Sequence, residues 1–268
     1  MILFDAHVHI YDVFHLDTLI ISAFENFDAA IRSLRQDMKN CSCFLLLAES
    51  NGPHYFSELR EKAQREGRGF SGSWSLAMTQ ENRSLQVFHP DFPDLSLFIV
   101  AGRQLVTKER LELLALFTDG EFAAGMDMQK AVDTVVSNGG LPVCAWGAGK
   151  WLGKRGLFLK DFLQSSAGSA VFLGDSGGRP TPWRPSRLLY LPSHRRRVVS
   201  GTDPLALAGE EKRVGSFGGY LEGICEQGRP AQYLQERMLK KDVNIRSFGR
   251  SLNMISFVRN QALLRMQR

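Results

Sequence analysis

The chain has 268 residues, 44% of them hydrophobic, and a formal net charge of +5. This length and apolar content exclude a disordered or fibrous chain and favour one large domain with a sizeable core. No apolar run is long enough to span a bilayer, and polar residues interrupt the apolar start, so we expect neither a membrane partner nor a signal peptide. The four cysteines lack zinc-finger or disulfide-framework spacing, which predicts reduced thiols in a cytoplasmic protein.

Apolar strand-like runs alternate with helical patterns along most of the chain. In chain order, strands are predicted at 2–10, 43–48, 97–101, 111–117, 141–146, 170–173 and 198–200, with a hairpin at 74–78 and 85–88. Helices are predicted at 19–35, 53–66, 127–138 and 158–165, and the tail at 231–268 has an amphipathic helical pattern with a break near 247–249.

Strand–helix alternation over one domain predicts an α/β fold with a mostly parallel sheet. A TIM-like (β/α) barrel of about seven or eight mostly parallel strands fits this order, and a doubly wound open sheet is the alternative. We expect residues 1–230 to form the barrel and residues 231–268 to form a C-terminal helical extension packed on it.

Two histidines, His7 and His9, lie near the end of the first predicted strand. Residues i and i+2 of a strand point to the same face, and imidazole is the commonest metal-binding side chain near neutral pH. The pair therefore predicts half of a metal site, with Asp5 on the same face; two hydrogen-bonded core histidines are the alternative.

Asp203 follows the last predicted strand of the barrel. A carboxylate at that end can bind a metal and accept a proton from a metal-bound water. Because the active ends of barrel strands gather at one face, Asp203 is predicted to join His7 and His9 there as metal ligand and general base. An Asp-Pro turn is the structural alternative.

Three segments together resemble a known group of enzymes. The run FDAHVHIYD at 4–12 is similar to the first strand of the amidohydrolase-like and polymerase-and-histidinol-phosphatase (PHP) metal-dependent hydrolases. GTD at 201–203 is similar to their closing motif, and FIVAGRQL at 98–105 is similar to a PHP strand that ends in Gly-x-Glu. The resemblance implies an αβ barrel, a divalent ion such as Zn²⁺ or Mn²⁺, and hydrolysis by metal-activated water.

The chain departs from the pattern of that group at several positions. Gln104 stands where the PHP glutamate is expected, and Leu205 where a histidine is expected. Glu49 and His54, which follow the second predicted strand, are therefore the next candidate metal ligands, and Glu112 could replace the missing acid. Gln104 remains a candidate for substrate binding.

Two glycine-containing loops are candidates for binding an anionic group. Lys150 lies in a loop at 147–151 between a strand and a helix-like stretch, where free backbone N–H groups and a cation could hold a phosphate or carboxylate. Asp175 ends the penultimate strand, and Arg179 in the loop after it could face an anionic ligand. The GDSGG run at 174–178 resembles a serine-protease motif, but no neighbouring histidine base supports that function.

The most concrete hypothesis is a metal-dependent hydrolase acting on a phosphoester or another small anionic substrate. A barrel that has lost its chemistry and serves as a ligand-binding or scaffold protein is the alternative. The basic charge alone does not lead us to expect nucleic acid as a partner, because no recognised binding motif accompanies it.

Overall fold

The computed structural model describes residues 1–50, 54–66, 73–194 and 197–266. Within them the strands are β1 (Ile2–Val8), β2 (Ser42–Leu47), β3 (Ser75–Met78), β4 (Ser84–Phe88), β5 (Ser96–Val100), β6 (Gly102–Val106), β7 (Glu112–Leu116), β8 (Leu141–Ala145), β9 (Phe172–Ser176), β10 (Val198–Gly201), β11 (Phe217–Leu221) and β12 (Arg246–Gly249). The α-helices are α1 (Leu16–Ser33), α2 (Tyr55–Glu66), α3 (Met128–Ser137), α4 (Gly153–Leu163), α5 (Pro230–Leu239) and α6 (Met254–Met266). The longer 3₁₀ turns are η3 (Arg187–Tyr190) and η4 (Glu210–Arg213).

The strands form two mixed sheets, so the prediction of a TIM-like barrel is wrong. One sheet has seven strands in the order β12-β11-β1-β2-β5-β4-β3, and the other has five in the order β10-β9-β8-β7-β6. β11, β4 and β7 pair antiparallel with their neighbours, which a repeated strand–helix unit would not produce. The α/β class is confirmed, but the hydrogen-bonded ladders do not close into one barrel.

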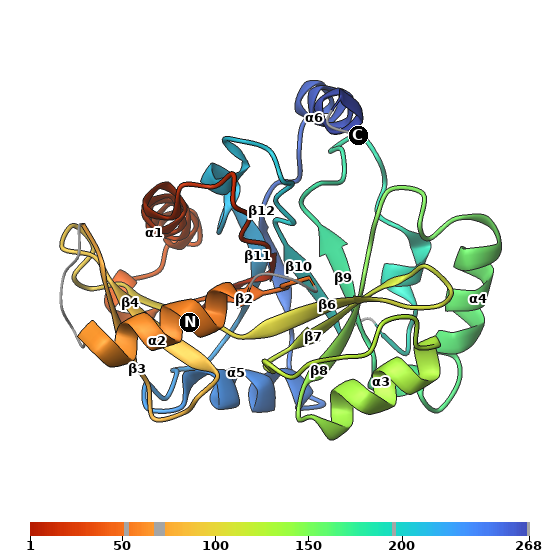
Figure 1. Cartoon of the computed structure of the whole chain (residues 1–268), viewed down its shortest axis with the longest axis horizontal. Helices are drawn as coiled ribbons and strands as arrows, with labels where there is room; N and C mark the ends of the chain where they lie inside the picture. The colour runs from red at the N-terminus through yellow and green to blue at the C-terminus, as the bar shows by residue number, and fades with distance from the viewer. Residues whose placement is uncertain (51–53, 67–72, 195–196, 267–268) are drawn as a thin grey trace.

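Two short seams bring the sheets together (Figure 1). At the first, Glu49 just beyond β2 forms a parallel bridge with Arg103 in β6. At the second, the Asp203 amide just beyond β10 donates a 2.9 Å hydrogen bond to the His7 carbonyl at the end of β1. Each seam has a glycine where the two backbones lie closest together. A Cβ on Gly102 would lie 2.0 Å from the Leu47 carbonyl oxygen, and a Cβ on Gly201 would lie 2.3 Å from the His7 backbone nitrogen. A larger residue would therefore not fit at either position.

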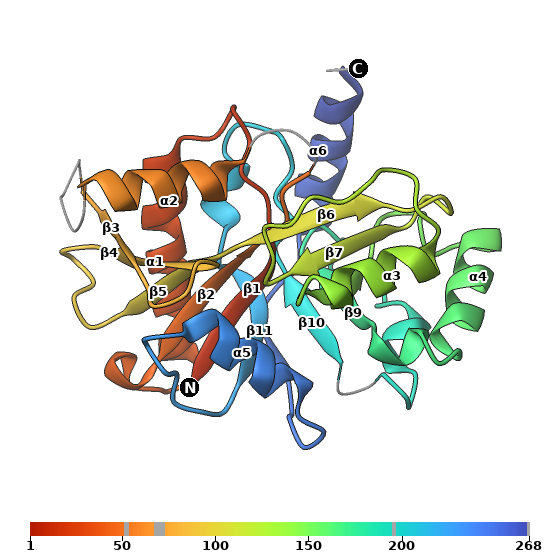
Figure 2. The same ribbon diagram turned by 60° about the horizontal axis from the view of Figure 1, so that its bottom comes forward.

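The apolar core is built in three parts that follow from these layers. The inner faces of the two sheets enclose a cluster that includes Phe4, Phe44, Phe98 and Phe172, and α5 covers one end of it (Figure 2). A second cluster packs α1 and α2 on the outer face of the larger sheet, and a third packs α3 and α4 on the smaller sheet. The interior is therefore filled at the end nearest α5, and polar side chains gather at the opposite strand ends.

The tail contains a strand where the sequence predicted a break between helices. Phe248 and its neighbours form β12, which pairs antiparallel with β11 at an edge of the larger sheet. The division at residue 231 stays a prediction. None of the helices in the described ranges is both long enough and apolar enough to cross a bilayer.

Candidate metal site

A β-bulge in β1 aims the two histidines toward the space between the sheets. Asp5 pairs with Leu45 and Val8 with Leu47, so three steps along β1 match two along β2. A bulge of this kind inserts one residue and reverses the alternation of side chains beyond it. Leu3 and Val8 both reach the outer cluster, which fits a reversal between them.

The same bulge separates Asp5 from the histidine face, so the prediction that Asp5 shares that face is wrong. The Asp5 carboxylate is fully buried and accepts hydrogen bonds from the Thr202 amide and hydroxyl, the Gly215 amide and the His7 amide. Burial raises the pKa of Asp5 to about 6, even though these four donors favour the carboxylate. Asp5 thus ties β1 to the segment after β10 and fixes the backbone that carries the site.

His7, His9 and Asp203 converge at the strand ends and form the one metal-competent group found among the described residues. The two Nε2 atoms lie 2.9 Å apart, and Oδ1 of Asp203 lies 3.6 Å from His7 Nε2 and 3.7 Å from His9 Nε2. Atoms that share one Zn²⁺ at bond lengths of about 2.0–2.2 Å have separations in this range. Two imidazoles and a carboxylate also suit Zn²⁺ or Mn²⁺ in their donor chemistry.

The protonation of the group fits a ligand role. Burial is the main cause that lowers the pKa of His9 to about 3, and the neighbouring His7 lowers it further, so His9 is neutral at pH 7. Burial opposes the charge on Asp203, but the nearby His7 and His9, the Ser176 hydroxyl and Arg213 more than offset it and lower its pKa. A neutral imidazole and an ionised carboxylate are the forms that bind a metal.

Asp203 is the member of the group that is most open to solvent. Its side chain is 24% exposed, whereas those of His7 and His9 are 6% and 5% exposed. Its φ of 49° lies in the left-handed region, which aspartate tolerates better than most residues and which is common at functional sites. Ser176 holds it in place, because its Oγ donates to Oδ2 of Asp203 at 2.9 Å.

Gln104, Ser176 and Tyr11 surround the group. Oε1 of Gln104 lies 3.0 Å from His7 Nε2, so the amide stands beside the group where the sequence lacks an acid. The Tyr11 ring lies 5.4 Å from the His9 ring. Burial, followed by the charges of Asp203 and Glu112, raises the Tyr11 pKa well above its usual value. Sequence reasoning missed Tyr11, which follows His9 by two residues, and set aside Ser176, which adjoins Asp175.

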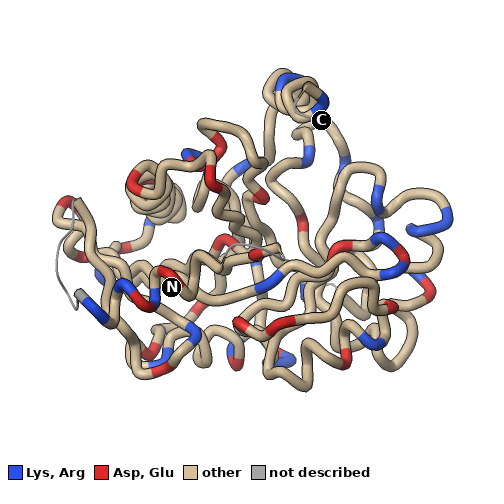
Figure 3. Tube along the Cα trace, in the orientation of Figure 1, with Lys and Arg blue, Asp and Glu red and all other residues tan. Residues whose placement is uncertain are grey.

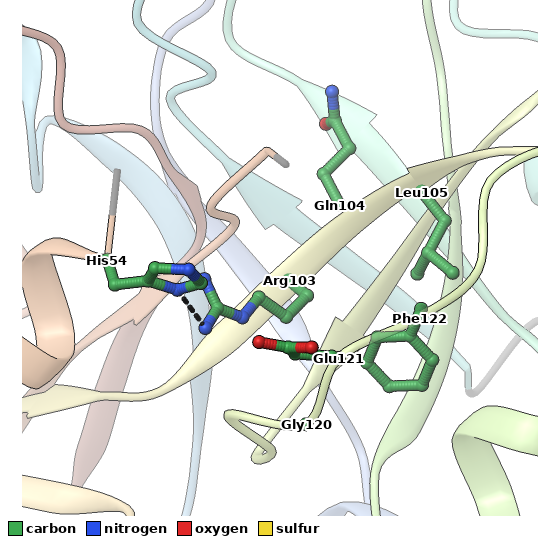
Figure 4. Close-up of a pocket in the computed structure, with 7 residues that line it drawn as sticks. All are labelled: His54, Arg103, Gln104, Leu105, Gly120, Glu121 and Phe122. Carbon is green, nitrogen blue, oxygen red and sulfur yellow. Dashed lines mark hydrogen bonds between the residues drawn. The ribbon is translucent and has the colours of Figure 1, made fainter. Parts of the chain in front are cut away.

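Glu49 and His54 lie in a separate cluster around Arg103. Arg103 Nη1 donates to Oε2 of Glu49 at 2.8 Å, and Nη2 lies 2.5 Å from Nδ1 of His54 (Figure 4). The Phe56 amide donates to Oε1 of Glu49, so this carboxylate also caps the start of α2. Burial raises the Glu49 pKa despite Arg103. These two candidates are therefore not brought to the group of His7, His9 and Asp203.

The predicted anion-binding cations are engaged with carboxylates. Lys150 forms an ion pair with Glu112 at the ends of β8 and β7. Arg179 donates two hydrogen bonds of 3.0 Å to Asp175, and a third to the Trp183 carbonyl. Arg179 is buried, whereas Lys150 is half-buried, and the charge of its partner Glu112 acts on Tyr11, whose ring lies beside His9. Lys150 is thus the better placed of the two to meet a ligand there.

No protein-family model matches this chain, and no curated protein matches it. A solved structure of Endonuclease Q, in complex with a 27-mer duplex substrate with an abasic lesion at the active site, resembles it with a TM-score of 0.46 and 8% sequence identity. The match covers 88% of this chain and 56% of Endonuclease Q, so the chain spans little more than half of that protein.

Two expectations from the sequence do not survive these comparisons. The resemblance to PHP and amidohydrolase-like enzymes is wrong as an assignment, because no family model matches and the sheets do not close into a barrel. The expectation that excludes nucleic acid is also withdrawn; the similar structure of Endonuclease Q holds a 27-mer duplex substrate. At this low similarity, neither the activity nor the substrate of Endonuclease Q is carried over to this chain.

Proposed function

We propose that this protein is a metal-dependent hydrolase whose centre is His7, His9 and Asp203. The observation that carries the proposal is the convergence of two imidazole nitrogens and one carboxylate oxygen within 3.7 Å of one another at the strand ends. A bound Zn²⁺ or Mn²⁺ would polarise an ester oxygen and make a water acidic near neutral pH.

The protein's own residues would position and deprotonate the reacting groups. Asp203 is ionised and partly exposed, which suits a general base, and Ser176 fixes one of its oxygens. Gln104 is placed to donate or accept a hydrogen bond beside His7, and Lys150 would attract an anionic substrate to the same edge. We favour a phosphoester over a carboxylic ester because Lys150, which is half-buried, borders this edge.

The experiment is hydrolysis of bis(p-nitrophenyl) phosphate, p-nitrophenyl phosphate and a DNA duplex with added Zn²⁺, Mn²⁺ or EDTA. We expect activity with at least one ion and none with EDTA. Asp203→Asn should lower the rate by about a hundredfold or more, as expected for loss of a general base. The control is His15→Gln, an exposed histidine that should leave the rate unchanged. Equal activity in EDTA would contradict the proposal.

A binding protein without chemistry is the second candidate, and one observation favours it. The His7 Nε2 atom is within hydrogen-bond distance of both His9 and Gln104, so the imidazoles can satisfy each other without a cation. In that case metal would not raise the melting temperature, whereas an ion bound to the native state must raise it. If added metal left the melting temperature unchanged and no hydrolysis were detected, the results would favour this candidate.

A further inference from the structure

Two segments of the chain contain several arginines and no acidic residue. Residues 176–202 hold six arginines and residues 243–268 hold five, so the remainder has 22 of the 33 basic residues and all 28 acidic ones. The two segments meet in the fold, because the Thr181 amide donates to the Leu252 carbonyl at 2.7 Å and the Trp183 and Phe257 rings lie 5.3 Å apart. The stretch after β9 and the start of α6 therefore lie side by side, and neither contains an acidic residue.

The helix α6 projects from the body at this region (Figures 1 and 2). It is anchored by Asn260, which donates to Glu210 at 2.7 Å, and by Phe257. In Figure 3 the helix carries basic positions and no acidic one. We call its outward face, together with Trp183 and Arg250 at its base, the α6 face.

The α6 face combines an apolar stripe with arginines on both sides. With about 3.6 residues per turn, a helix aligns residues spaced three and four apart. That spacing aligns Ile255, Val258, Ala262 and Met266, and the exposed fractions of Ile255, Val258 and Met266 are 83%, 58% and 82%. Arg259 and Arg265 flank the stripe.

The arginines of the α6 face are not neutralised within the described parts of the chain. Arg250, Arg259 and Arg265 are exposed, and no described carboxylate forms an ion pair with them. Arg259 contacts only the amide oxygen of Asn260 among the hydrogen bonds assigned to its side chain. By contrast, Arg179 and Arg213, which lie nearby, are both paired with carboxylates.

We infer that the α6 face docks on an anionic membrane surface. Because Ile255, Val258 and Met266 are exposed between arginines, this face can bury apolar side chains among lipid headgroups while its arginines meet lipid phosphates. Trp183, whose side chain is 43% exposed beside the helix, adds the kind of ring that favours this interface. A second copy of the same face would oppose arginine to arginine, and a nucleic acid would leave the apolar stripe unused.

The test is sedimentation of the full chain with vesicles of POPC alone or of equimolar POPC and POPG, in EDTA and at increasing salt. Because metal and substrate are absent, the result is independent of the proposed hydrolase. We expect binding to the POPG vesicles only, weakening as salt rises, and a blue shift of tryptophan emission that Trp183→Phe removes.

Variants of the α6 face and their controls distinguish docking by this face from nonspecific adsorption to vesicles. Arg259→Gln with Arg265→Gln should weaken binding about thirtyfold, at the usual contribution of a basic residue near a charged bilayer. Ile255→Glu should weaken it about tenfold or more.

The control for the double arginine variant is Lys108→Gln with Lys130→Gln, which removes two exposed cations outside the α6 face. The control for Ile255→Glu is Ile224→Glu, because Ile224 is 84% exposed and also lies outside the α6 face. No binding to POPG vesicles, equal binding to POPC, or an equal loss in the controls would overturn the inference. Tighter binding to single-stranded DNA than to POPG vesicles would overturn it in favour of a nucleic acid.

Discussion

The amide of Asp203 donates a 2.9 Å hydrogen bond to the carbonyl of His7, and the carboxylate of the same aspartate lies 3.6 Å from the His7 imidazole. One backbone contact between β1 and the segment after β10 therefore places both side chains at the metal group. The group depends on how closely the two sheets approach, and this seam is where it is most sensitive to substitution.

Gly201→Ala should disrupt both the fold and the metal group. A Cβ at this position would lie 2.3 Å from the backbone nitrogen of His7 and 2.6 Å from the Cβ of His7. Neither of these His7 atoms can move without a shift of the β1 backbone. We expect a loss of about 1–3 kcal/mol in the free energy of unfolding, as for overpacking in a core, and weaker metal uptake. The measurements are urea unfolding and metal titration.

The control for this substitution is Gly228→Ala. The added methyl group would meet only the side-chain amide of Gln80, which is exposed and can move. A similar loss of stability in both variants, or unchanged metal uptake in Gly201→Ala, would contradict the role of the seam.

The metal-free protein should lose stability in acid because of His9. Its pKa is about 3 when folded and about 6.5 when unfolded, so the unfolded state binds a proton first as the pH falls. The stabilisation by neutral His9 is complete above pH 6.5 and is lost as the pH falls toward 3, by about 1.4 kcal/mol per pH unit. At pH 5 the loss attributable to His9 should be about 2 kcal/mol.

Urea unfolding in EDTA at pH 7 and pH 5 measures this effect. The free energy of unfolding should differ between pH 7 and pH 5 by about 2 kcal/mol less in His9→Gln than in wild type. In the exposed control His15→Gln, this difference should equal that of wild type. Identical pH dependence in wild type and His9→Gln would show that His9 is not held neutral.

Gln104→Glu should strengthen metal binding. The Gln104 oxygen already lies 3.0 Å from His7 Nε2, so a carboxylate there would add a negative charge beside the group without a change of length. We expect about a tenfold or greater gain in affinity for Zn²⁺ or Mn²⁺ by calorimetry, comparable with the effect of groups next to metal ligands. Gln129→Glu on the surface of α3 is the control, and a weaker affinity in Gln104→Glu would argue against the placement of the ion.

Glu49 and Arg103 should matter for stability at the other seam. Both are almost fully buried, with exposed fractions of 6% and 7%, and removing one partner leaves a buried charge. Arg103→Ala should therefore cost about 3–5 kcal/mol in the free energy of unfolding. Arg60→Ala, which breaks a more exposed pair with Asp119, should cost about 1 kcal/mol or less. If urea unfolding gave equal losses, Arg103 would have no special place at the seam.

The sequence predicted the local elements of the fold better than their pairing. The first strand is confirmed at 2–8, ending one residue before His9, and the hairpin at 74–78 and 85–88 is confirmed as β3 and β4. Local apolar patterns encode both elements. β11 was missed because its sequence FGGYL resembles a turn, and its two glycines are explained only by the close approach of β1. The antiparallel direction of β7 depends on pairing with β6 and β8, which no local pattern reveals.

For the candidate site, the spacing of His7 and His9 indicated the imidazoles, and their meeting with Asp203 is what the structure adds. The position of Asp5 was predicted wrongly because a single bulge reverses the side chains beyond it. Arg103 was missed because an arginine in an apolar strand has no signature until Glu49 is placed beside it.

The most direct test of the central claim is the metal content of the protein purified without chelator and dialysed against a small excess of Zn²⁺ or Mn²⁺. Our account predicts about one equivalent in wild type and in His15→Gln, and less than about a tenth of an equivalent in the folded His7→Ala, His9→Ala double variant. Equal metal content in the double variant and wild type would contradict the assignment of His7, His9 and Asp203 as the metal centre.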